Sequence, residues 1–119
     1  MGELSHIRNV LDEIKGQDHV SSVSLISRGG LYIMGDSLKG VHPETFAAMT
    51  AIMIGAAETA SAEMKEGLGH VLIKLSERDL ILMGAGTRYM LAITTDGHGE
   101  NDKIAVTAAQ TIGRVDISI

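Results

Sequence analysis

Apolar residues recur at helical spacing near the beginning of the chain. Gly16 follows this segment, and glycine commonly ends a helix. The pattern therefore predicts an amphipathic helix over residues 3–15. Its apolar face has residues at steps of three and four, namely Leu4, Ile7, Leu11 and Ile14.

A longer apolar segment predicts a central helix over residues 43–66. Pro43 fits its first turn, because proline lacks the N–H group that this turn leaves without a helical partner. Gly67 and Gly69 are the expected end signals.

The last segment with helical spacing follows the polar loop at 96–102. Asn101 or Asp102 is the candidate capping residue, and the helix is predicted to extend to about Arg114. Its apolar stripe contains Ile104, Ala108, Ile112 and Val115.

Five segments have the composition of β-strands. Residues 19–27 and 31–36 are separated by Arg28-Gly29-Gly30, which predicts a β-hairpin. Three more segments are joined by short turns and predict an antiparallel meander; they cover residues 70–76, 80–86 and 89–95.

Two of these strands are continuously apolar, at "LILM" (80–83) and "MLAI" (90–93), where a sheet with one wet face would alternate. Such strands indicate a sheet covered on both faces. We therefore expect an α+β fold: a five-stranded antiparallel sheet with helices on both faces. The chain is predicted to form a single domain over residues 1–119, which is an ordinary length for one compact unit.

The central helix is apolar over a wide arc, of roughly 200°, whereas a helix on one sheet face needs little more than 100°. Glu58, Lys65 and Glu66 are expected on the opposite, wet side. At about 100° per residue, one stripe lies within about 60° of Phe46 and has Ile52 and Ile54 on its flanks; it contains Met49, Met53, Ala57, Ala60 and Met64.

Two explanations of this width stay open. The helix can be buried deeply within its own domain, for example beneath a loop. Alternatively, the extra width contacts a second copy of the chain, because methionines adapt to a partner and small residues permit close approach. The small residues are Ala48, Ala51, Gly55, Ala56 and Ala60. Since monomers rarely expose large apolar patches, we favour a homodimer.

Composition narrows the classes of function. The 119 residues include no cysteine, which excludes thiol catalysis, disulfides and cysteine-bound zinc. Ten basic residues are scattered among fifteen acidic ones, so we expect no nucleic-acid partner. The charged opening segment has no signal-peptide core, and the longest apolar run falls short of the roughly 20 residues that span a bilayer. We expect a cytoplasmic protein without membrane insertion.

The residues capable of chemistry form no recognisable active site. The five histidines make no close ligand pair, and the loop from Asp96 to Asp102 lacks the central glycine and the terminal glutamate of an EF-hand calcium loop. Gly84-Ala85-Gly86 lacks the lysine of a phosphate loop. Arg28 is expected to be a plain turn residue rather than a partner contact. We therefore predict no catalytic residue, no metal and no cofactor.

Three segments together resemble the roadblock (dynein light-chain) family over about residues 4–115. They are "VSLISRGGLYIMGD", "ETFAAMTAIMIGAAETASAEM" and "HVLIKLSERDLILMGAGTRYMLAITT", and stand-alone copies of this kind are typical of prokaryotes. Family members often have Asp-Gly at the hairpin tip, where this chain has Arg28-Gly29-Gly30. That difference affects what the tip contacts but no element of the fold.

The resemblance implies a profilin-like fold and a homodimer. The strand at 70–76 would pair with its counterpart across a two-fold axis, and the central helices would pack beside each other over a continuous ten-stranded sheet. The residues carried over as dimer contacts are Met49, Ile52, Met53, Ala56, Ala60, Val71, Ile73 and Leu75.

Three functions stay open at this point. The resemblance favours a non-enzymatic scaffold or regulator that binds a small Ras-like GTPase. A small-molecule sensor of the profilin-like or PAS-like kind would need an internal cavity with a few polar groups. The third alternative is a purely structural dimerisation module of a larger complex.

Overall fold

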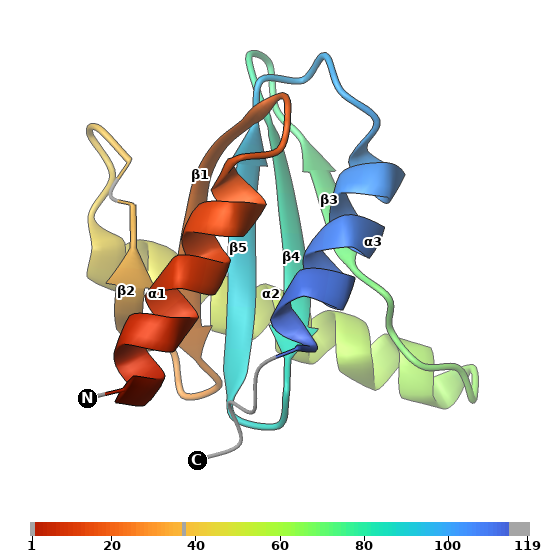
Figure 1. The fold of residues 1–119 in the computed structure, drawn as a ribbon. Helices are drawn as coiled ribbons and strands as arrows, with labels where there is room; N and C mark the ends of the chain where they lie inside the picture. Colours follow the sequence, from red (N-terminus) through yellow and green to blue (C-terminus); the bar gives the residue numbers. More distant parts are fainter. Residues whose placement is uncertain (1, 37, 115–119) are drawn as a thin grey trace.

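The computed structural model describes residues 2–36 and 38–114, with side chains from Ser5 onward, so the predicted positions of Leu4 and Val115 lie outside the described side chains (Figure 1). The predicted order of elements is confirmed. It is α1 (Gly2–Lys15), β1 (Val20–Ser27), β2 (Tyr32–Gly35), α2 (Pro43–Glu63), β3 (Val71–Lys74), β4 (Asp79–Ala85), β5 (Tyr89–Thr95) and α3 (Asn101–Ile112).

The strands form one antiparallel sheet in the order β2-β1-β5-β4-β3. The predicted hairpin and the predicted meander join where β1 pairs with β5, with Leu25 opposite Leu91. This order places the short strands β2 and β3 at the two edges of the sheet.

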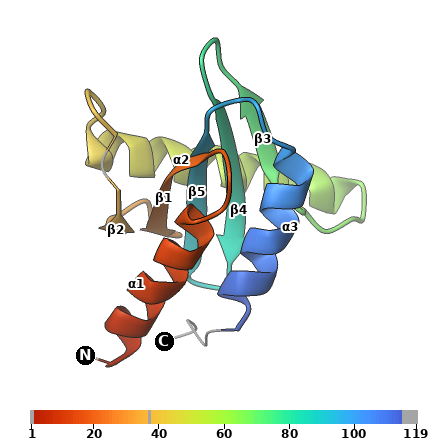
Figure 2. The same cartoon turned by 45° about the horizontal axis from the view of Figure 1, so that its top comes forward.

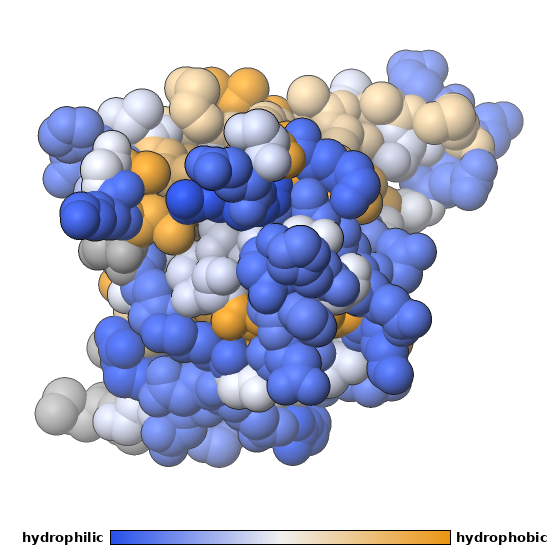
Figure 3. Space-filling model, turned by 90° about the horizontal axis from the view of Figure 1, so that it is seen from above, coloured by the Kyte–Doolittle hydropathy of each residue, from blue (hydrophilic) through white to orange (hydrophobic). Residues whose placement is uncertain are grey.

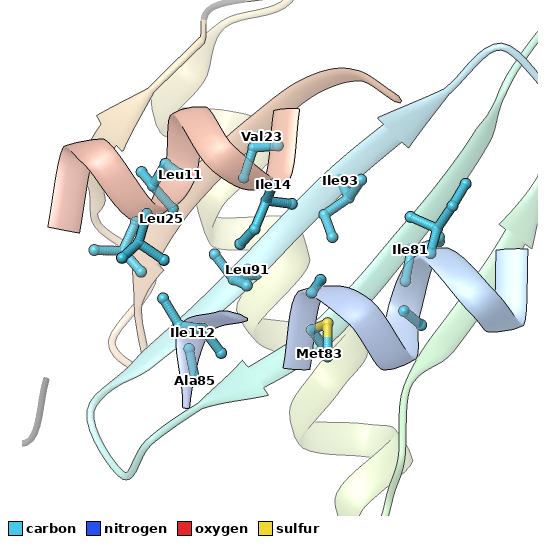
Figure 4. Close-up of a cluster of buried hydrophobic side chains, with 14 of the residues drawn as sticks. Leu11, Ile14, Val23, Leu25, Ile81, Met83, Ala85, Leu91, Ile93 and Ile112 are labelled. Carbon is cyan, nitrogen blue, oxygen red and sulfur yellow. The ribbon is translucent and has the colours of Figure 1, made fainter. Parts of the chain in front are cut away.

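Two apolar cores lie on opposite faces of this sheet. Helices α1 and α3 cover one face, where Leu11 and Ile14 pack with Leu25 and Leu91 (Figure 4). Helix α2 crosses the other face, where Ile54 belongs to a second core (Figure 2). Neighbouring residues of one strand serve different cores because side chains alternate across a sheet. The prediction of a five-stranded sheet covered on both faces is confirmed.

The start of β4 differs from the sequence prediction. Asp79, expected in a turn, is the buried first residue of this strand. Its carboxylate accepts hydrogen bonds from Asn101 Nδ2 at 2.7 Å and Lys74 Nζ at 3.1 Å. Both partners, the Asn101 amide first, lower the pKa of Asp79 below its ordinary value.

This contact also corrects the predicted cap of α3. Asn101 lies inside the helix and its side-chain amide is directed to Asp79, while the N-cap position is Glu100, which makes no side-chain capping bond. Asp102 also lies inside α3, so neither predicted capping residue has that role.

Helix α2 ends before the predicted glycines. Its last residue is Glu63, followed by Met64 at the cap and by Lys65 with a φ of 60°. The residue that follows a helix in the left-handed conformation is usually glycine. Here Lys65 takes that conformation, so the glycine signal at Gly67 placed the helix end too late in the chain. None of the helices in the described part of the chain has the length and apolarity to cross a bilayer.

Candidate interaction surface

The face that α2 turns toward the sheet differs from the predicted one. The helix is buried at Ala47, Thr50 and Ile54, whereas Met49 and Met64 of the predicted stripe are 47% and 67% exposed. Phe46 and Met53 of the stripe do pack against the second core. The predicted stripe is therefore only partly right, and Ile54, which was predicted on its flank, is the buried centre.

The tip of the β1–β2 hairpin explains this orientation. Gly30 has a φ of 91°, and a Cβ atom added there would lie 3.3 Å from Ala48 Cα and 3.6 Å from Ala51 Cβ. Small residues of α2 thus lie against the hairpin tip, because larger ones would clash there. The predicted stripe was placed by its large apolar residues, whereas the packing here is decided by small ones.

The opposite side of α2 is apolar and exposed. Ile52 is 62% exposed, and Ala56 and Ala60 are also on the surface, whereas Met53 is partly buried and packs against the second core. Seen from above, apolar surface gathers along α2, while the side of α1 and α3 is mainly hydrophilic (Figure 3). The predicted helix contacts therefore lie on or beside one apolar surface.

Strand β3 lies next to this surface and pairs only with β4 in the described sheet. Val71 and Ile73 are partly buried on the α2 face, and Leu75 beyond the strand is 52% exposed. Leu72 is also exposed, on the opposite face of β3. The predicted interface omitted Leu72, although the alternation of side chains along the strand was a signal for it.

A groove of about 380 Å³ separates α2 from the β3–β4 turn. Val41 and Phe46 line one side, and Leu75 and Leu80 line the other. Two exposed basic residues, Lys39 and Arg78, also line it. The sequence prediction missed this groove, because its two sides are far apart in the chain.

Arg28 lies in the predicted turn, but it is not a plain turn residue, because it connects the hairpin to α2. Its guanidinium Nη1 donates to both carboxylate oxygens of Glu58, at 2.7 and 2.8 Å, and Nη2 donates to Gly86 O at 3.3 Å. A Cβ atom on Gly84 would lie 2.7 Å from Nη2, so this glycine leaves room for the guanidinium. Glu58 is therefore a partly buried ion-pair partner, not part of the predicted wet side.

A second, polar hollow of about 530 Å³ lies at the start of α3, lined by residues that include His19, His98 and Lys103. His19 Nδ1 lies 3.0 Å from the Asp96 carboxylate. The pKa of Asp96 is lowered, mainly by the hydrogen bond from the backbone N–H of His98 and secondly by the hydrogen bond with the His19 side chain. Within the described residues no group of three histidine or acidic side chains is placed to hold a metal ion.

Solved structures with this fold include several bacterial proteins. MglB from Myxococcus xanthus is 16% identical with a TM-score of 0.82, over 96% of this chain and 90% of that one. The gliding protein MglB of Thermus thermophilus is 16% identical with a TM-score of 0.78, over 96% and 90%. A Roadblock/LC7 domain from Streptomyces avermitilis is 17% identical with a TM-score of 0.76, over 88% and 90%. At these identities the likeness shows the fold.

Family membership comes from the sequence itself. No curated protein matches the chain. The sequence profile of the Roadblock/LC7 domain matches residues 6–95, which include α2 and all five strands. The chain therefore belongs to the Roadblock/LC7 domain family.

Proposed function

We propose that the chain forms a homodimer and that this dimer is a non-enzymatic cytoplasmic scaffold for a small Ras-like GTPase. The observation that carries the proposal is that an exposed apolar helix face lies next to an unpaired strand edge. The apolar side of α2 and the open edge of β3 lie next to each other. Each would be a liability in an isolated subunit, and one partner would cover both.

The dimer uses the α2 residues Met49, Ile52, Ala56 and Ala60, with Met53 beside them. On β3 it uses Val71, Ile73 and Leu75. Antiparallel pairing of two β3 strands provides partners for the free N–H and C=O groups along that edge and extends the sheet across both subunits. Exposed alanines on α2 support close approach of the two helices.

The GTPase partner is supported by membership of the Roadblock/LC7 family, whose members are expected to bind such proteins. In this proposal the dimer holds the switch segments of the GTPase in one arrangement and contributes no catalytic group of its own. The sensor alternative is not favoured, because the polar hollow at His19 opens on the surface, whereas a sensor needs an internal cavity.

Analytical ultracentrifugation with candidate GTPases tests the proposal. The GTPases are those encoded near this gene, each loaded with GDP or with a non-hydrolysable GTP analogue. We expect one of them to co-sediment with the dimer in a nucleotide-dependent manner. A dimer that binds none of them in either state would leave only the structural dimerisation module.

A further inference from the structure

We propose that the groove beside Phe46 is a socket for the carboxyl-terminal end of α2 from a second copy of the chain. This inference rests on the proposed homodimer. It assigns an occupant to a groove that a single chain leaves open, and that is therefore incomplete without the partner.

The position of α2 supplies the first argument. Its carboxyl-terminal end extends beyond β3 and past the edge of the sheet, in both views of the fold (Figures 1 and 2). Met64 at this end is 67% exposed. The groove lies at the other end of the sheet, beside the β3–β4 turn that contains Arg78.

The symmetry of the dimer brings these two places together. When two β3 edges pair antiparallel, the two-fold axis is perpendicular to the sheet, so both α2 helices lie on the same face. The same rotation exchanges the two ends of the strands. The overhanging end of each α2 is thereby carried across β3 to the partner's β3–β4 turn, where the groove is open.

The chemistry of the two surfaces is complementary. The groove presents Phe46, Leu75 and Leu80 to an apolar side chain, and Met64 is a flexible side chain suited to fill it. Lys39 and Arg78 add two positive charges to its lining.

The helix end brings the opposite charge. Glu63 and Glu66 flank Met64, and the last turn of α2 contains no basic residue. Although Lys65 lies in the same segment, the carbonyl groups at a helix carboxyl terminus add further partial negative charge. The socket therefore combines an apolar contact with opposite charges around it.

Cross-linking tests this arrangement directly, because the chain has no cysteine of its own. Glu63→Cys and Arg78→Cys variants are made separately, mixed, and oxidised under mild conditions. We expect a disulfide-linked heterodimer whose link is cleaved by a reductant. The matched control mixes Glu63→Cys with Gln110→Cys, which places the second cysteine on an exposed position of α3, across the sheet from α2.

Charge reversal provides a second readout that does not depend on disulfide geometry. Arg78→Glu should raise the dimer dissociation constant about tenfold, and adding Glu63→Lys and Glu66→Lys should recover most of that loss. Sedimentation of the unmodified chain comes first. Suppose that the unmodified chain is a dimer, but the disulfide between positions 63 and 78 forms no faster than the control and the Arg78→Glu loss is not rescued. That result overturns the proposed socket and leaves the proposed homodimer in place. A chain that stays monomeric at every concentration overturns both.

Discussion

At the scale of single residues, the Thr50 hydroxyl offers the most direct test of the packing. Thr50 is fully buried between α2 and the sheet, and its Oγ1 has no hydrogen-bond partner among the described residues. A buried polar group without a partner keeps its desolvation cost. We therefore expect Thr50→Val to raise the free energy of unfolding by up to about 1 kcal/mol, since valine has nearly the same shape and helix propensity.

Thr111 is the matched control for this substitution. It is also a buried helical threonine, but its Oγ1 donates to Thr107 O at 2.8 Å. Thr111→Val should lower the free energy of unfolding by about 1 kcal/mol, because it removes a hydrogen bond. Urea unfolding at one fixed protein concentration compares the variants. Equal effects at the two positions would show that the Thr50 hydroxyl has a partner in solution.

Asp79 should make the stability of the protein depend on acid pH. The Asn101 amide and the Lys74 ammonium lower its pKa in the folded state, so the folded state favours the ionised carboxylate. The stability that the ionised Asp79 contributes is complete above the pKa of this residue in the unfolded chain. It is lost as the pH falls through the lower pKa of the folded state. The wild-type protein should therefore lose stability in that acidic range.

The Asp79→Asn variant measures this contribution. It should be less stable than the wild type near neutral pH, and the difference should shrink as the pH falls below the ordinary range for aspartate, about 3.5–4. Unfolding curves at several pH values provide the comparison. Asp96→Asn is the parallel variant for the other carboxyl group with a lowered pKa. A constant difference for Asp79→Asn at all pH values would contradict the assignment.

At the scale of elements, the Arg28–Glu58 pair holds the hairpin tip against α2. The two side chains are 30% and 43% exposed, so water screens the pair and its net value is modest. A double-mutant cycle with Arg28→Met and Glu58→Gln should give a coupling of about 0.5–1 kcal/mol that falls as salt is added.

The Lys15–Asp36 pair is the control for this cycle, because it has comparable exposure but a single contact at 3.1 Å. A cycle with Lys15→Met and Asp36→Asn should give a smaller coupling, since Arg28 Nη1 contacts both oxygens of Glu58 whereas Lys15 contacts one oxygen of Asp36. Equal couplings would mean that the second hydrogen bond of Arg28 adds nothing to the attachment of α2.

The exposed side of α2 predicts a specific effect on assembly. Ala56 lies in the proposed interface, and a charge there would be buried against the partner without a counter-ion. Ala56→Glu should therefore shift the protein to monomers or make it insoluble. Ala109→Glu places the same charge on an exposed position of α3, on the other face of the sheet, and should leave the dimer intact. Sedimentation velocity compares them, and a well-folded Ala56→Glu dimer would show that the interface lies elsewhere.

The same helix shows how far the sequence could predict the structure. Helical spacing, Pro43 and the strand alternation were sufficient for every element and for their order. The rotation of α2 was not predictable from spacing, because its apolar arc is about twice as wide as one sheet face needs and the contact at Gly30 decides it. The predicted amino-terminal cap of α3 was wrong for a related reason: the Asn101 side chain donates to Asp79, a residue far away in the sequence.

At the scale of the whole molecule, the family resemblance predicts an interface of α2 and the strand at 70–76, but local patterns could not show how these two elements lie relative to each other. The sheet order places β3 at an edge, which is a long-range property of pairing. The groove arises in the same way, from Phe46 and Leu80 in distant segments. Local patterns thus predicted the elements that carry this surface, whereas the sheet topology brings them side by side.

If the dimer is the folded unit, its stability must depend on protein concentration. Unfolding then releases two chains from each dimer, so dilution favours the unfolded state by mass action. A tenfold increase in concentration is worth about 1.4 kcal/mol per dimer, which should raise the midpoint of thermal unfolding by about 3 °C for a unit of this size. Calorimetry at three concentrations spanning a hundredfold range measures this slope.

The Ala56→Glu variant is the internal control for that slope. If it is a folded monomer, its midpoint should be lower than that of the wild type and independent of concentration, because one chain then unfolds to one chain. The Ala109→Glu variant should keep the wild-type slope. A wild-type midpoint that does not change over the whole range would mean that each chain folds alone, and that the apolar side of α2 is reserved for a different partner.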